Sequence, residues 1–259
     1  MAHRGASEDE AEHTLAAYER ALADGADGLE CDVRLTRDGV LVCVHDRRID
    51  RTSTGRGRVS ALELADLAEL DFASWRRPGV EERAEAPDWD RGGVLTLDRL
   101  LTVAAESNRP VDVAIETKHP TRYAGLVELA LAELLTKHRL TPSAPNSLVR
   151  VRVMSFAAAS LRRMRAMSPT VPTVYLMTRV PLRQRNGMLP AGAVAAGPSL
   201  RVLRAHPSYV ERVQAAGGQV HVWTVNSAAD VDYVADLGVD VIITNRPGAV
   251  REQLERRAG

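Results

Sequence analysis

Short apolar, β-branched segments alternate with amphipathic segments along most of this 259-residue chain. Parallel strands need long crossover connections, usually helices, so the alternation predicts a parallel sheet covered by helices. Eight strand candidates in a chain of this length favour closure into an α/β TIM (β/α)8 barrel. The predicted strands are Met1–Arg4, Asp27–Val33, Val111–Glu116, Val149–Ser155, Val171–Met177, Gly192–Ala196, Gln219–Val225 and Val239–Thr244.

The clearest helices lie between these strands, and the composition supplies the core that such a barrel needs. With 45% hydrophobic residues, we expect residues 1–259 to form a single large domain. Glycines after two of the helices, Gly25 and Gly238, are typical helix ends. The predicted helices are Thr14–Asp24, Leu126–His138, Pro207–Ala216 and Ala228–Leu237.

One hairpin and one long insertion interrupt the alternation. Asp38-Gly39 between two apolar runs is a strong hairpin signal, so Val40–Val44 is predicted to be an extra strand. Its return brings His45 beside Asp32. Residues 53–93 are rich in turn residues around one weak helix, Ala61–Leu70. We expect this loop-rich insertion to lie over the C-terminal face, where barrel active sites are found.

Charge and cysteine content exclude several classes of function. The 34 basic and 34 acidic residues leave no net charge, which argues against a nucleic-acid partner. No apolar run reaches 18 residues, so no membrane span is predicted. Two cysteines, Cys31 and Cys43, are expected to be buried free thiols, and with no signal peptide they indicate the cytoplasm. Because only Met1-Ala2 precedes His3, we also expect the N-terminus to be slightly truncated.

Carboxylates gather at the predicted strand ends. Side chains two apart on a strand share a face, so Glu30 projects with Asp32, and Glu116 projects with Lys118. Carboxylates in an apolar context are costly unless they are paired or bind a metal. Oxygen ligands without cysteine suit a hard cation, so we expect one divalent ion, Ca²⁺ or Mg²⁺, and a phosphate beside it. Lys118 is one of only two lysines among 34 basic residues, which indicates a need for a compact charge.

An ordered set of motifs carries a family resemblance over nearly the whole chain. The chain closely resembles the glycerophosphodiester phosphodiesterase family. The motifs are His3-Arg4-Gly5, Glu12-His13-Thr14, Glu30-Cys31-Asp32-Val33, Val44-His45-Asp46, Ile115-Glu116-Thr117-Lys118, Ser155-Phe156, Trp223-Thr224-Val225-Asn226 and Thr244-Asn245-Arg246-Pro247. The resemblance implies a TIM barrel that hydrolyses glycerophosphodiesters, which are small molecules, to glycerol 3-phosphate and an alcohol with the help of a divalent metal.

The resemblance also implies a role for each matching residue. The metal ligands are Glu30, Asp32 and Glu116; the catalytic histidines are His3 and His45; the phosphate contacts are Arg4 and Lys118; Trp223 lines the substrate pocket. The glycerol 2-hydroxyl is implied as the first nucleophile, giving a cyclic phosphate that water opens. We favour His3 as base and His45 as acid. His13 stands where the family often has asparagine, and we leave it out of the site.

Two alternatives and the choice of substrate stay open at this point. The same site suits a lysophospholipase D-type or cyclising phospholipid enzyme, and a catalytically silent barrel could bind phosphodiesters without cleaving them. We expect substrate choice to depend on residues 53–93, with Trp75 and Trp89 as apolar walls, or otherwise on Arg179–Pro190.

The sequence does not indicate an oligomeric state. His119, His138, His206 and His221 are interpreted as structural or surface residues.

Overall fold

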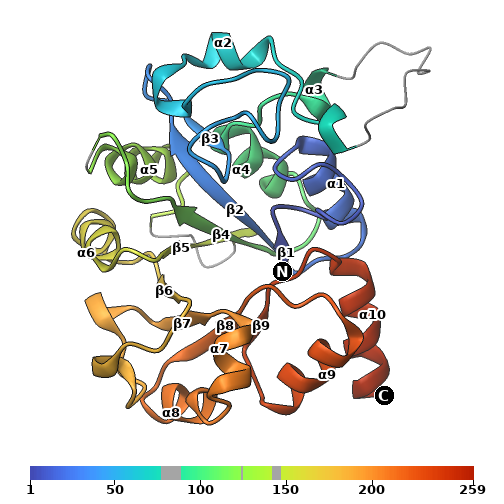
Figure 1. The fold of residues 1–259 in the computed structure, drawn as a ribbon, viewed down its shortest axis with the longest axis vertical. Coiled ribbons are helices and arrows are strands. Elements are labelled where there is room, and N and C mark those ends of the chain that lie inside the picture. The colour runs from blue at the N-terminus through green and yellow to red at the C-terminus, as the bar shows by residue number, and fades with distance from the viewer. Residues whose placement is uncertain (77–88, 124, 142–146) are drawn as a thin grey trace.

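Eight parallel strands form a barrel within the residues that this computed structural model describes, which are 1–76, 89–123, 125–141 and 147–259. Figure 1 shows the strands inside and the helices around them. The strands are β1 (Ala2–His3), β2 (Gly28–Leu35), β4 (Val111–Thr117), β5 (Val149–Ser155), β6 (Thr173–Met177), β7 (Ala195–Pro198), β8 (Gln219–Val222) and β9 (Val241–Ile242).

The barrel closes where its first and last strands meet. Each strand pairs in parallel with the next, from β1 to β9. Beyond the end of β9, Thr244 forms a parallel bridge to Ala2. Its carbonyl accepts a hydrogen bond from His3 N at 2.7 Å, and its own N–H donates to Met1 O at 3.0 Å. The predicted eight-stranded barrel is therefore confirmed.

Helices connect most of the strands on the outside of the barrel. They are α1 (Leu15–Ala23), α4 (Leu97–Ala105), α5 (Leu126–Lys137), α6 (Ala158–Met167), α7 (Leu200–Ala205), α8 (Tyr209–Ala215), α9 (Ala228–Asp236) and α10 (Pro247–Ala258). Between β6 and β7 the described chain has only the 3-10 turns Leu182–Gln184 and Pro190–Gly192, so the loop predicted there is confirmed. None of the helices in the described part is long and apolar enough to cross a membrane.

The predicted hairpin strand is present as β3 (Leu41–Cys43), which pairs antiparallel with β2. The turn uses Gly39 at φ +86°, a conformation that glycine adopts without strain. The returning chain is fixed by a 3.0 Å hydrogen bond from Val44 N to Asp32 O. This bond places His45 beside Asp32, as the sequence predicted.

The insertion after β3 has a small core of its own (cyan, at the top of Figure 1). This core contains Val42, Val44, Ile49, Val59, Leu67 and Phe72. The weak helix is present but shorter than predicted, as α2 (Leu64–Ala68), and α3 (Trp89–Gly92) ends the segment. Residues 77–88 and the Trp89 side chain, which was predicted to form an apolar wall, lie outside the described residues.

Strand β2 shows how the sequence divides the barrel interior from its exterior. Leu29, Cys31 and Val33 pack outward with the surrounding helices in the largest apolar cluster. The intervening Glu30 and Asp32 therefore face the interior. Both cysteines are buried and unbridged, as expected.

A buried histidine occupies the barrel interior away from these carboxylates. His221 on β8 is fully buried, and Arg152 Nη1 donates to its Nε2 at 3.2 Å. Asp112 Oδ2 accepts from Arg152 Nη2 at 2.7 Å. Burial and the neighbouring Arg152 charge lower the pKa of His221 to about 3. The imidazole is therefore neutral in the folded protein.

The neutral His221 predicts a loss of stability in mild acid. Unfolding exposes a histidine that takes up a proton below its unfolded pKa of about 6.5, so stability falls as the pH drops from about 6.5 towards about 3. Between pH 7 and 4.5, His221→Gln should lose roughly 2 kcal/mol less free energy of unfolding than the wild type does. Urea unfolding at each pH measures this difference. The exposed His206→Gln variant is the control and should follow the wild type. An identical pH dependence for His221→Gln would contradict the assignment.

Candidate active site

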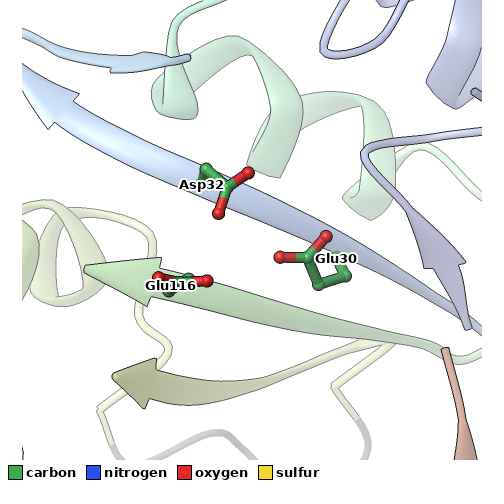
Figure 2. Close-up of side chains that lie close together, drawn as sticks. All are labelled: Glu30, Asp32 and Glu116. Atoms are coloured by element: carbon green, nitrogen blue, oxygen red, sulfur yellow. The ribbon is translucent and has the colours of Figure 1, made fainter. Parts of the chain in front are cut away.

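Three carboxylates converge between the middle of β2 and the end of β4. Asp32 and Glu116 are direct neighbours in the parallel register, and Glu30 lies two residues before Asp32 on the same face. One oxygen from each of Glu30, Asp32 and Glu116 lies within 4.8 Å of the others. Figure 2 shows the three groups pointing toward one another. Their exposed fractions are only 4%, 1% and 7%.

This crowding opposes full ionisation of the three groups. Burial, with the charges of Asp32 and Glu116, raises the pKa of Glu30 well above its usual range. Burial and Asp32 also raise the pKa of Glu116 to about 8. A divalent cation would stabilise the ionised forms, and clustered carboxylate oxygens are the donors that Ca²⁺ and Mg²⁺ prefer. The donor set therefore fits such an ion.

Two cations compensate part of the negative charge. Lys118 Nζ lies 2.8 Å from Glu116 Oε1 and 3.2 Å from Asp32 Oδ1. Arg4 Nε lies 3.1 Å from Asp32 Oδ2. Burial opposes ionisation of Asp32, but the His13 hydrogen bond and the Lys118 and Arg4 charges lower its pKa well below the usual range. Asp32 is thus the carboxylate that stays ionised.

Arg4 is positioned by a tight turn after β1. Its backbone has φ +59°, and its N–H donates to Glu30 Oε2 at 3.1 Å. Gly5 follows at φ +84°, where an added Cβ would lie 2.6 Å from Ala17. Only glycine fits there, which explains the third residue of the His-Arg-Gly motif in structural terms.

His13 is a site residue that the sequence reasoning omitted. Its Nε2 donates to Asp32 Oδ2 at 2.9 Å, and its Nδ1 lies 2.9 Å from the Tyr18 hydroxyl. Tyr18 in turn donates to the backbone carbonyl of Glu30 at 3.1 Å. His13 is buried and has φ +63°. His13 therefore contacts one of the three carboxylates directly, which the sequence analysis did not anticipate.

His3 lies at the mouth of the barrel as a neutral imidazole. Its Nδ1 donates to Asn245 Oδ1 at 2.7 Å, which leaves Nε2 with a free lone pair. Burial and the Arg4 charge lower the pKa of His3 to about 4. At neutral pH this ring can accept a proton.

His45 has a different partner from His3. Its Nδ1 donates to Asp46 Oδ1 at 2.7 Å, and Arg51 Nε donates to the other Asp46 oxygen at 2.6 Å. Arg51 also binds Glu12, which accepts from Arg4 at 3.0 Å. This chain of ion pairs links His45 to Arg4. Burial lowers the pKa of His45, while the carboxylates of Asp32 and Asp46 oppose that shift.

A pocket of about 120 Å³ brings most of the predicted residues together. Of the predicted site residues, His3, Arg4, Glu30, His45, Glu116, Lys118 and Trp223 line it. Asp32 is not part of the lining, because it lies behind Lys118, Arg4 and His13. None of the described residues in 53–93 lines this pocket.

The opposite wall of the pocket is apolar and was only partly predicted. Trp223 Nε1 donates to Gly197 O at 2.7 Å, and the Phe156 ring meets Trp223 edge-on at 5.5 Å. Phe156 is 41% exposed and lines the pocket. The other apolar lining residues are Met154, Leu176 and Ile243.

The position of His13 generates a prediction about metal binding. His13→Ala should weaken Mg²⁺ or Ca²⁺ binding about 10- to 100-fold, the usual effect of losing a group that orients a ligand. Tyr18→Phe should weaken it less, because His13 keeps its bond to Asp32. Isothermal titration calorimetry measures the metal affinity of both variants. The control is His138→Ala, because His138 bonds Asp98 away from the site. Unchanged affinity in His13→Ala would show that Asp32 needs no such support.

This chain is similar in sequence to known proteins over nearly its whole length. A probable glycerophosphodiester phosphodiesterase 1 of Mycobacterium tuberculosis is 47% identical over 98% of this chain and 92% of its own length. A glycerophosphodiester phosphodiesterase of Bacillus subtilis is 35% identical over 95% of this chain and 83% of its own length.

Solved structures show the same fold. A phosphodiesterase of Oleispira antarctica, in complex with sn-glycerol-3-phosphate, has a TM-score of 0.82 at 22% identity and covers 98% of this chain and 95% of its own. A glycerophosphodiester phosphodiesterase of Parabacteroides distasonis has a TM-score of 0.76 at 25% identity. It covers 100% of this chain and 97% of its own. The model of the glycerophosphoryl diester phosphodiesterase family matches residues 3–249. The chain therefore belongs to the glycerophosphoryl diester phosphodiesterase family and is a phosphoric diester hydrolase.

Proposed function

We propose that this enzyme hydrolyses glycerophosphodiesters to glycerol 3-phosphate and an alcohol, with one Ca²⁺ or Mg²⁺ held by Glu30, Asp32 and Glu116. The observation that carries the proposal is the buried three-carboxylate cluster, which lies beside two histidines at the mouth of a barrel of this family. The two buried free cysteines agree with a cytoplasmic enzyme.

The cations of the site bind the phosphate. A divalent ion, when bound, supplies positive charge that polarises the phosphoryl oxygens. Lys118 and Arg4 reach the same pocket and neutralise charge that develops on the phosphate oxygens in the transition state. Arg4 Nε lies 3.1 Å from Asp32 Oδ2 but without the geometry of a hydrogen bond, so this N–H stays available to donate to a phosphate oxygen.

The hydrogen-bond partners of the two histidines distinguish their roles. His3 binds a neutral amide and keeps Nε2 free, so it accepts the proton of the attacking hydroxyl, either the glycerol 2-hydroxyl or water. His45 binds the Asp46 carboxylate, which stabilises an imidazolium. His45 therefore gives a proton to the leaving alcohol oxygen. Trp223 and Phe156 offer an apolar surface for the carbon atoms of the substrate.

The carboxylate cluster predicts strict dependence on a divalent ion. Glu30→Gln, Asp32→Asn and Glu116→Gln should each weaken metal binding at least about 100-fold, because each removes a charged ligand. Chelation should abolish wild-type turnover, and Mg²⁺ or Ca²⁺ should restore it. The exposed Glu133→Gln variant is the matched control. A variant with wild-type affinity and turnover would remove that residue from the ligand set.

The histidine roles can be separated with the leaving group. His3→Ala and His45→Ala should each lose 10²–10⁴-fold in kcat on an alkyl ester and keep metal affinity. With glycerophospho-p-nitrophenol, whose leaving group needs no proton, His45→Ala should regain most of its rate and His3→Ala should not. The reverse pattern would exchange the two roles. Losses below about tenfold in both variants would rule out the two-histidine mechanism.

A further inference from the structure

A second recess adjoins the active site and is strongly basic. It is lined by residues from β2, the insertion after β3 and the loop after β4, and Lys118 belongs to both pockets. Among its described lining residues there are five cations and no carboxylate, although the chain as a whole is neutral. The five cations are Arg34, Arg47, Arg58, Lys118 and Arg122.

The arginines of this recess lack acidic partners. Within the described residues, no carboxylate lies within 4.0 Å of a nitrogen of Arg34, Arg47, Arg58 or Arg122. This contrasts with Arg37, Arg48 and Arg51 nearby, each of which forms an ion pair. Burial lowers the pKa of Arg34 and the Arg47 charge adds to that shift, while the more distant carboxylates of Asp32, Asp46 and Glu116 oppose it. An anion bound in direct contact would stabilise these guanidinium groups further.

The walls of the recess are held together by specific contacts. The Tyr123 hydroxyl donates to Ser60 O at 2.7 Å and joins the loop after β4 to the insertion. Val59 N donates to Arg47 O at 3.1 Å, which fixes the Arg47 and Arg58 segments side by side. The recess is thus formed by the fold.

The recess lies on the His45 side of the catalytic pocket. Arg34 follows Asp32 by two residues on the same face of β2, about 7 Å farther along the strand. Its Nε and Nη2 donate to the His45 carbonyl at 2.9 and 2.6 Å. Since we assign His45 to the leaving alcohol, that alcohol would extend toward the arginines.

We propose that this recess is a subsite for a second phosphate carried by the leaving group, so that the enzyme prefers glycerophosphodiesters whose alcohol is itself phosphorylated. Guanidinium groups bind phosphate in a bidentate manner, which several arginines around one recess favour. This inference rests on the proposed function and specifies its substrate class. It also gives residues 53–93 a role in substrate choice, through Arg58 and Ser60.

A matched pair of substrates tests the subsite. Glycerophosphoinositol 4-phosphate and glycerophosphoinositol differ only in one phosphate. The wild type should have at least about a tenfold higher kcat/KM for the phosphorylated ester at low salt, and the preference should decline at high salt. The double variant Arg58→Gln/Arg122→Gln should lose the preference and keep kcat/KM for glycerophosphoinositol. Arg256→Gln, on α10, removes an exposed charge elsewhere and should keep the preference.

A binding measurement separates this inference from the proposed function. Inositol 4-phosphate is titrated into metal-loaded enzyme saturated with glycerol 3-phosphate, and inositol serves as the control ligand. We expect the wild type to bind inositol 4-phosphate at least about tenfold more tightly than the double variant does. If the wild type cleaves no glycerophosphodiester, the proposed function fails, and this titration still decides the subsite. Equal kcat/KM for both esters, or equal binding by wild type and double variant, would overturn the inference.

Discussion

The repulsion among three buried carboxylates is the constraint around which the catalytic end of this barrel is built. Glu30, Asp32 and Glu116 are brought together by adjacent parallel strands, whose register places Asp32 directly beside Glu116. Such a cluster is unfavourable unless cations approach it. Lys118, Arg4 and His13 supply part of that compensation. The remaining negative charge is what suits the site to a divalent ion and, through that ion, to a phosphate.

Closure of the barrel connects this cluster to the histidines that we propose as acid and base. β1 is only two residues long, yet its hydrogen bonds to Thr244 and its pairing with β2 fix His3 opposite Glu30. The chain after β9 then supplies Asn245, which orients the His3 ring. His45 depends instead on the hairpin, whose returning strand is bonded to Asp32. Both histidines are thus positioned by backbone contacts to the same strands that hold the carboxylates.

The sequence predicted most of the fold because periodicity is a local property. The alternation of Leu29, Cys31 and Val33 with Glu30 and Asp32 identified both faces of β2, and Asp38-Gly39 identified the hairpin. His13 was missed because it lies in a turn, where no periodicity shows which way a side chain points. The basic recess was missed because its arginines come from β2, from the chain after β3 and from the loop after β4, and only the fold brings them together. Phe156 could have been identified as a pocket residue from the sequence, since it directly follows a predicted strand.

The central claim is that the carboxylate cluster is a single metal centre, and anomalous diffraction from crystals grown with Mn²⁺ tests it most directly. One strong anomalous peak should lie about 2.0–2.6 Å from an oxygen of each of Glu30, Asp32 and Glu116, and Lys118 should be displaced from at least one of its present partners. The peak should disappear in crystals of Glu116→Gln. A peak bound by other residues, or no peak at Mn²⁺ concentrations that support turnover, would contradict the account.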